Sequence, residues 1–582
     1  MPMSRPSPML GRAALLGLLL TLAGCADFGD AEPGVVNECT SDDACAASAQ
    51  CDDDEGLCVA ETSEPLEIAI EVIPPADLSG LPMPSWTTAP ETLEGPLERD
   101  LQQPPHVDIV GQLRWRGERV PAEILFTRET LDGRPDARVR VSTLPEVQTI
   151  AEMEADFVAR LGPGRSYQVE VRPSSEAMPG TDTPWLRQLP PLRVAQVETP
   201  SVTTAEDGAT SFVWPVELSY PEDLTPECGG ERFAGCTLSG SVVDLVEGDE
   251  VPEAGLQVRA VEVETGLTVS STGLTDEEGR FSIVTSPNAG RYVLRVGGGE
   301  DGLSPTISVD PAFLFGGELR IRVPRTERVV YQGRVESADG RGIGATLTFT
   351  ANDVIEDSGL GGSFSATVES RSEGSDIGAF EVTLLAGTYE VVITPAEPGL
   401  AVIAEELRLT PTASGEPVRG QLFTLPERAR FGGTVTTSGG ERVPNVSVEA
   451  VALGVAEGDE VSPAAVYNRS SETVTDETGL FDLRLDLGRY DVFLKPPAES
   501  RYAWVVVPDR AVGSLDATFA DVFELAAPVP VRGVVRSSGG APLEGAEVRV
   551  YGRASAEERF VELGRARSDE TGSYLLLVSP RL

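Results

Sequence analysis

Cysteine is the residue type in this chain whose spacing points most directly to chemistry. A tight group of four and a local pair stand apart from the rest, at Cys39, Cys45, Cys51, Cys58, Cys228 and Cys236. The tight group could bind zinc in a cytosolic protein, but the single histidine, His106, lies far from it in the sequence. In an exported protein six such thiols are typical of three disulfides. The tight group allows three pairings, and among them we expect Cys39–Cys51 with Cys45–Cys58.

Three acidic residues recur in a second pattern that could hold a cation. Asp276, Asp476 and Asp569 each precede a glycine by three positions, as in the stretch TDETG. Calcium takes about six to eight oxygen ligands, and these stretches offer few. A tight turn needs an Asp that accepts backbone hydrogen bonds and a Gly that adopts a positive φ. We therefore expect turns between strands and no metal, and keep the three carboxylates only as weak cation candidates.

Catalytic patterns are lacking in the sequence. His106 lies in QQPPHVD before an expected strand, without a G-x-S-x-G elbow or an H-E-x-x-H partner. Carboxylates are abundant, but no pair stands out as an acid and a base. We expect no enzyme activity and no cofactor.

The N-terminus carries an export signal. Two arginines and the apolar run 13–22 precede Leu-Ala-Gly-Cys at residues 22–25, and the run is too short to span a bilayer. This motif resembles the lipobox of bacterial lipoproteins, which implies cleavage before Cys25 and lipidation of that residue. Two or more acyl chains would anchor the protein stably. By the same analogy, an Asp directly after Cys25 would favour retention in the inner membrane, and Ala26 at this position therefore indicates the outer membrane. Whether the protein faces the periplasm or the cell surface stays open.

The formal net charge is −47, with the acidic residues spread along the chain. This charge opposes binding to nucleic acid, because phosphate contacts require basic side chains. Solubility and self-repulsion at the surface are the simplest reading of the acidity.

The elements that must position all these residues are repeats. The stretch Thr475–Leu494 has close relatives at Thr275–Val296 and Ser568–Val578, and looser ones at 375–393 and 155–171. A marker glycine lies upstream of each, at Gly111, Gly240, Gly333, Gly433 and Gly533. The last four glycines are about 100 residues apart, which is the size of a domain. Apolar residues alternate with period two between turn residues, so each repeat is predicted to be an all-β sandwich of roughly seven strands.

The repeat motifs also resemble a known family. The series G-x-V, P-x-x-G/N-x-x-V, T-D-x-x-G-x-F and G-x-Y-x-V resembles the carboxypeptidase regulatory-like domain, a prealbumin-like sandwich also grouped with carbohydrate-binding-like folds. The resemblance covers 240–582 well and 107–200 loosely, since the first repeat lacks T-D-x-x-G. The zinc ligands of the related peptidases belong to a catalytic domain that this sequence lacks. The tyrosines of G-x-Y-x-V, at Tyr292, Tyr389 and Tyr490, resemble a tyrosine corner.

Tryptophans offer a possible sugar platform, since sugar sites present aromatic faces. Trp86 and Trp115 are the weak candidates. Trp115 stands at strand spacing from Leu113, which favours packing of its ring in the core. The proline-rich surroundings of Trp86 favour neither core packing nor a sugar platform.

We expect the following organisation: signal peptide 1–24, lipidated cysteine-rich module 25–62, a strand plus a proline-rich spacer 63–106, and sandwiches 107–227, 228–326, 327–427, 428–528 and 529–582. Short connections between the sandwiches favour a semi-rigid rod. The last repeat ends after SYLLLV, before any G-x-Y-x-V strand. An incomplete sandwich would leave an open strand edge, and the hypothesis that this edge accepts a partner's strand stands beside two alternatives, a shortened gene and a locally closed domain.

Together these features predict a non-enzymatic outer-membrane lipoprotein that binds or scaffolds at the cell envelope. Its expected partners are the membrane, through the lipid on Cys25, and envelope or surface proteins or glycans. Carbohydrate binding is the first alternative function, and a structural spacer or adhesin is the second.

Overall fold

The computed structural model describes residues 36–45, 49–53, 55–60, 65–75, 85–127, 139–150, 152–174, 189–200, 211–224, 228, 234–246, 249–298, 305–309, 319–323, 327–352, 354, 362–412, 416–454, 463–553 and 559–582. The described fold is all-β, with short 3-10 turns at Asp42–Ala44 (η1), Pro463–Tyr467 (η4) and Ala498–Ser500 (η5). Within these ranges no helix has the length and apolar character needed to cross a membrane.

The fourth sandwich shows the plan of the repeat. Its strands are β33 (Ala429–Thr437), β34 (Ser447–Gly454), β35 (Ser471–Val474), β36 (Leu480–Leu485), β37 (Gly488–Lys495), β38 (Val505–Val512) and β39 (Thr518–Leu525). One sheet has the order β36-β33-β39, with β39 parallel to β33, and the other has the antiparallel order β35-β34-β37-β38. Alternate residues of both sheets are buried between them, as the period-two pattern predicts.

The second and third sandwiches follow this plan. The second contains β18 (Thr237–Val246), β19 (Asp249–Pro252), β20 (Gln257–Glu262), β21 (Gly273–Leu274), β22 (Arg280–Val284), β23 (Tyr292–Gly297), β24 (Thr306–Val309) and β25 (Arg320–Arg322). The third contains β26 (Arg328–Ser337), β27 (Ala345–Ala351), β28 (Gly362–Glu369), β29 (Ala379–Leu385), β30 (Gly387–Pro395), β31 (Ile403–Leu409) and β32 (Val418–Leu425). Strand β24 pairs with β28, so one eight-stranded sheet and one apolar core run through both.

The first sandwich is the most divergent. Its strands are β8 (His106–Trp115), β9 (Glu118–Arg119), β10 (Ala122–Thr127), β11 (Val139–Ser142), β12 (Gln148–Ile150), β13 (Met153–Ala155), β14 (Phe157–Leu161), β15 (Ser166–Pro173), β16 (Leu192–Glu198) and β17 (Ser211–Ser219). The two main sheets have the orders β11-β10-β15-β16 and β14-β8-β17, which match the fourth sandwich in strand position and direction.

The marker glycines lie where an aromatic ring crosses the first strand. Gly111 is opposite Phe157 and Gly433 is opposite Phe481 in the antiparallel ladders. A Cβ atom on Gly111 would lie 1.9 Å from the Phe157 ring, and one on Gly433 would lie 2.7 Å from the Phe481 ring. Only glycine leaves room for these rings, whereas at Gly240 and Gly533 a Cβ atom would meet the carbonyl oxygens of Leu319 at 2.4 Å and Arg99 at 2.0 Å.

The fifth sandwich is built from both ends of the chain. Its C-terminal part, 529–578, contributes β40 (Val529–Arg536), β41 (Glu547–Arg553), β42 (Val561–Arg567) and β43 (Ser573–Val578). Its N-terminal part, 66–102, contributes β3 (Leu66–Ile73), β4 (Trp86–Thr87), β5 (Glu91–Leu93), β6 (Leu97–Glu98) and β7 (Leu101–Gln102). We call the described parts of 66–102, namely 66–75 and 85–102, the clasp segment, and the described parts of 529–578, namely 529–553 and 559–578, the acceptor.

The sheets of the fifth sandwich reproduce those of the fourth. Strand β3 lies antiparallel to β41, as β37 does to β34, and β6 and β7 run parallel to β40, as β39 does to β33. The structure therefore differs from the prediction of a spacer at 63–106 and of an incomplete sandwich at 529–582. The described strands of the spacer supply the missing part, so the open edge is filled by the chain itself and not by a partner.

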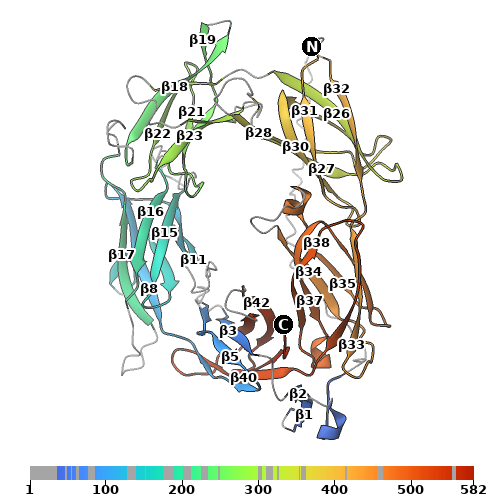
Figure 1. The fold of residues 1–582 in the computed structure, drawn as a ribbon. Coiled ribbons are helices and arrows are strands. Elements are labelled where there is room, and N and C mark those ends of the chain that lie inside the picture. The colour runs from blue at the N-terminus through green and yellow to red at the C-terminus, as the bar shows by residue number, and fades with distance from the viewer. Residues whose placement is uncertain are drawn as a thin grey trace, which may run out of the picture.

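This arrangement closes the molecule into a ring of five sandwiches (Figure 1). The last strand of each sandwich leads to the first strand of the next, and β7 of the fifth leads in the same way to β8 of the first. The semi-rigid rod expected from the short connections is thus wrong in shape, because the clasp segment brings the start of the array back to its end.

Candidate interaction sites

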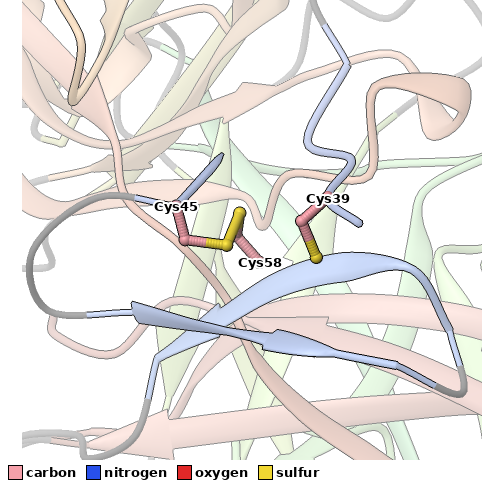
Figure 2. Close-up of side chains that lie close together, drawn as sticks. All are labelled: Cys39, Cys45 and Cys58. Atoms are coloured by element: carbon pink, nitrogen blue, oxygen red, sulfur yellow. A yellow bond between two sulfur atoms is a disulfide. The ribbon is translucent and has the colours of Figure 1, made fainter. Parts of the chain in front are cut away.

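The N-terminal disulfide module is a small hairpin of β1 (Ala49–Asp52) and β2 (Leu57–Ala60). The structure contains Cys39–Cys51 and Cys45–Cys58, which is the expected pairing, and also Cys228–Cys236. The sulfur atoms of Cys39, Cys45 and Cys58 lie within 4.8 Å of one another, and Figure 2 shows the bond between the latter two. Sulfurs in disulfides offer no thiolate to a metal, so this cluster is a covalent crosslink.

The module docks where the fourth sandwich meets the fifth. Asn37 donates from its backbone N–H to the Ser500 carbonyl at 2.8 Å, and its side chain donates to the Cys58 carbonyl at 2.9 Å. Arg501 donates to the Glu55 carbonyl at 2.7 Å. Arg532, on β40, forms an ion pair with Asp52 at 3.3 Å. The module is therefore fixed to both sandwiches and does not swing free of them.

The clasp segment meets the acceptor through an apolar core. Leu66, Ile68, Ile70, Val72, Leu93 and Leu101 of the clasp pack with Val531, Val535, Val548, Val550, Leu563 and Leu576 of the acceptor, all of them buried. Ile70 and Val550 are register partners and are both 0% exposed. Burying an aliphatic side chain of this size contributes about 1.5–3 kcal/mol, so this core is the main source of stability for the fifth sandwich.

Polar contacts fix the register of the clasp. Arg553 pairs with Glu67 at 2.7 Å, and the hydroxyl of Tyr551 donates to Glu71 at 2.9 Å. Burial raises the pKa of Tyr551 to about 12, so the hydroxyl keeps its proton at neutral pH. Gly533 lies beside the clasp backbone, because a Cβ atom there would be 2.0 Å from the carbonyl oxygen of Arg99.

The three acidic candidates form turns, as expected. The Oδ1 atom of Asp476 accepts hydrogen bonds from the backbone N–H groups of Thr478 at 2.8 Å and Leu480 at 3.0 Å, and from the Thr478 hydroxyl at 2.7 Å. Gly479 has φ +70°, the conformation that the turn requires. Asp276 and Asp569 accept the equivalent backbone hydrogen bonds in their own repeats.

These turn hydrogen bonds also set the acidity of the carboxyl groups. Hydrogen bonds from Thr478 and from Thr571 lower the pKa values of Asp476 and Asp569, respectively. The backbone N–H of Arg280 has the same effect on Asp276. Each oxygen that accepts these bonds holds its turn.

His106 is buried at the start of β8 beside Asp108, with Nε2 3.7 Å from the carboxylate. Arg160 donates to the same carboxylate at 2.8 Å. Burial raises the pKa of Asp108, but the hydrogen bonds from His106 and Arg160 outweigh burial and lower the pKa overall. The histidine thus lies beside the Asp108–Arg160 ion pair within the first sandwich.

The candidate tryptophans pack against cores. Trp86 is partly buried against the core of the fifth sandwich, and Trp115 against that of the first. The indole N–H of Trp115 donates to the Pro221 carbonyl at 3.2 Å, and the Arg116 guanidinium lies 4.6 Å from its ring centroid. The Arg116 guanidinium therefore lies over the Trp115 ring.

A buried charge cluster joins the third and fourth sandwiches, and sequence analysis did not predict it. Asp486 is 0% exposed and accepts from the backbone N–H of Val402, in the third sandwich, at 3.0 Å. Arg469 donates to this carboxylate at 3.0 Å and to the Leu400 carbonyl at 2.5 Å. Arg428 lies 3.2 Å from the same carboxylate. These bonds cross the junction and fix the angle between the two sandwiches.

Two tyrosines form the predicted corner. Tyr389 donates from its hydroxyl to the Leu385 carbonyl at 2.9 Å, and Tyr490 donates to the Asp486 carbonyl at 3.1 Å. Tyr292 is buried at the same strand position. Residues 1–24 and Cys25, on which the lipoprotein prediction rests, lie outside the described residues.

Comparison with known proteins yields only distant structural matches. No protein-family model matches the chain, and neither does any curated protein sequence. Among solved structures, the Bacillus anthracis TIE protein is similar at 11% identity and a TM-score of 0.17, covering 85% of this chain and 73% of its own. The streptococcal ancillary pilin is similar at 12% identity and a TM-score of 0.19, covering 56% of this chain and 99% of its own.

The Bacillus cereus major pilin subunit BcpA is similar at 12% identity and a TM-score of 0.15, covering 50% of this chain and 99% of its own. Because these TM-scores are low, the fold assignment rests on the strand pairing within this chain, which gives tandem β-sandwiches after a disulfide-rich segment.

Proposed function

We propose that this protein is a lipid-anchored outer-membrane protein that scaffolds or binds partners at the cell envelope, without turning over a substrate. The observation that carries the proposal is the docking of the disulfide module onto the junction of the fourth and fifth sandwiches. The module follows Cys25 closely in the sequence, so a lipid there would tether the whole ring and not a loose end. Three disulfides suit an oxidising compartment outside the cytoplasm.

The ring also changes which part of the array would face outward. In a rod the fifth sandwich would stand furthest from the anchor. Figure 1 instead shows β1 and β2 beside the fifth sandwich, with the second and third sandwiches across the ring from them. We propose that the second and third sandwiches, which share one sheet and one core, form the part presented to envelope or surface partners.

The residues that first suggested chemistry have structural roles in the described part of the chain. The three repeated aspartates hold turns, His106 is buried beside the Asp108–Arg160 ion pair, and the clustered cysteines are crosslinked. The positions of Trp86 and Trp115 do not favour glycan binding over protein binding.

Replacement of the anchoring cysteine tests the proposal. Cells that express Cys25→Ser should leave the protein unlabelled by an alkyne-palmitate probe and release it from the membrane fraction. Ala26→Asp is the matched control, because by analogy with lipoprotein sorting it should keep the label but move the protein to the inner membrane. Unchanged labelling and membrane association of Cys25→Ser would overturn the proposal.

A further inference from the structure

We propose that Arg259 and Arg295, which are opposite each other in the second sandwich, bind a carboxylate carried by an acidic segment of a partner protein. The proposal rests on the proposed function and deepens it, because it names a site within the presented second and third sandwiches and the chemistry of the partner that this site takes.

The two arginines lie side by side on an exposed face of a sheet. They are register partners in the antiparallel ladder of β20 and β23, and both are exposed. The residues that flank them along these strands are buried in the core, namely Val258, Ala260, Leu294 and Val296. The arginine side chains therefore point to the other face, away from the core. Register partners on one face have Cβ atoms about 4.5–5.5 Å apart, and like charges at this spacing destabilise a sheet.

Other arginine pairs in this chain show which group such a pair accepts. Arg114 and Arg119 are also register partners. Arg114 lies 3.0 Å from one carboxylate oxygen of Asp156, and Arg119 lies 2.6 Å from the other. Two more register pairs have carboxylates of the chain beside them, Arg430 and Arg484 with Asp482, and Arg549 and Arg565 with Glu547 and Glu562. A carboxylate between the guanidinium groups thus offsets their repulsion.

The pair in the second sandwich lacks this carboxylate. In the part of the chain that the structure describes, neither Arg259 nor Arg295 forms an ion pair. Guanidinium groups bind carboxylates through paired, charge-assisted hydrogen bonds, so a carboxylate from outside would fit this pair as Asp156 fits Arg114 and Arg119.

Aliphatic side chains on the same face favour a protein segment over a glycan as the source of the carboxylate. Leu274 is 64% exposed and is the register partner of Gln257, two residues before Arg259. Val263 is 51% exposed, four residues after Arg259, and its backbone N–H continues the ladder by donating to the Arg291 carbonyl at 2.9 Å. Protein interfaces combine arginine with apolar side chains, whereas sugar sites present aromatic faces. An extended peptide with aliphatic residues at alternate positions beside its acid therefore fits this face.

Fluorescence anisotropy with the purified full chain in non-ionic detergent tests the proposal. The probe is the fluorescein-labelled peptide Leu-Ser-Glu-Ser-Val-Ser-Val, and its counterpart has Gln in place of Glu. A labelled oligogalacturonate carries the same carboxylate chemistry on a glycan. The binding variant combines Arg259→Gln with Arg295→Gln. The matched control combines Arg430→Gln with Arg484→Gln, which removes the same charge from a register pair that already has its carboxylate.

We expect saturable binding of the acidic peptide to the unmodified chain and to the control. The Gln peptide and the binding variant should each raise Kd about tenfold or more, as for the loss of a charge-assisted hydrogen bond. Absence of binding by the acidic peptide, or equal binding to the binding variant, would overturn the proposal. Tighter binding of the oligogalacturonate than of the peptide would also overturn it. The assay needs no membrane, so failure of the lipid anchor and failure of this site are distinguishable.

Thermal unfolding separates a binding role of the pair from a structural one. Arg295→Gln removes the repulsion from Arg259, so it should raise the Tm of the full chain at low salt, and the gain should shrink at high salt. A pair that stabilises the fold would give the opposite change. A lower Tm for Arg295→Gln than for the unmodified chain would therefore contradict the assignment of these arginines to a partner.

Discussion

Ile70→Ala should open the ring by weakening the fifth sandwich. Ile70 is 0% exposed and faces Val550, in a core shared by the clasp and the acceptor. Truncating a fully buried isoleucine to alanine costs about 2–5 kcal/mol, because the lost burial is joined by an unfilled cavity. For a domain of this size each 1 kcal/mol lowers Tm by about 4–8 °C, so even a 2 kcal/mol loss lowers the Tm of the fifth sandwich by about 8–16 °C.

Differential scanning calorimetry of the full chain would measure this shift, and small-angle scattering above the new transition would show a larger radius of gyration. Val522→Ala is the matched control, because Val522 is 72% exposed and its truncation should leave both measurements unchanged. The double variant Ile70→Ala with Val550→Ala should show a coupling energy of about 0.5–3 kcal/mol, as expected for residues in contact. An Ile70→Ala protein that melts and scatters like the unmodified chain would show that the clasp does not complete the fifth sandwich.

Three further outcomes are expected. Gly533→Ala should destabilise the fifth sandwich in calorimetry, because its Cβ atom would meet the Arg99 carbonyl, whereas Gly564→Ala, whose nearest neighbour would be 3.5 Å away, should be tolerated. Asp486→Ala should cost about 3–5 kcal/mol in denaturant unfolding, since it leaves the buried Arg428 and the partly exposed Arg469 without this carboxylate, and Asp482→Ala, which breaks an exposed pair, only about 0–1 kcal/mol. Because the folded pKa of Asp476 is depressed, its turn contributes stability above the unfolded pKa of about 3.9 and loses it as pH falls through the folded pKa. Asp476→Asn should therefore flatten the acid limb of a plot of stability against pH, and an unchanged limb would contradict the turn assignment.

The repeat motifs predicted much of the fold because local rules govern them. Alternating apolar residues, the TDETG turn and the tyrosine of G-x-Y-x-V each act within a few residues of their partners, so their roles could be read from the sequence. The marker glycines were found by repetition alone, and the structure adds the reason, which is the space needed by rings such as Phe157.

Sequence analysis missed the split of the fifth sandwich because β3, the strand that corresponds to the G-x-Y-x-V strand of the other repeats, does not contain that motif. In register, Ile68 of β3 occupies the position that Tyr490 has in β37, and Leu66 occupies that of Gly488. No G-x-Y remains to link LEIAIEVI to the repeats, and its partner strand lies more than four hundred positions away, as the register pair of Ile70 and Val550 shows. Two features of the sequence, taken together, could have indicated the split. An apolar strand without a domain lies near the start, and a domain without its last strands lies at the end.

The charge cluster at Asp486 was missed for a different reason. Its members come from separate turns and strands, and each looks like an ordinary surface residue in a chain rich in acids and arginines. Only the angle between the third and fourth sandwiches brings Val402 to this carboxylate, and that angle has no sequence signature.

Hydrogen–deuterium exchange of the full chain, followed by mass spectrometry, tests the completed fifth sandwich most directly. Peptides that cover β3, Leu66–Ile73, should exchange as slowly as those that cover β37, Gly488–Lys495, since the two strands hold the same position between paired neighbours. Exchange of β3 at the rate of an unstructured peptide, beside slow exchange of β37, would contradict the closed ring.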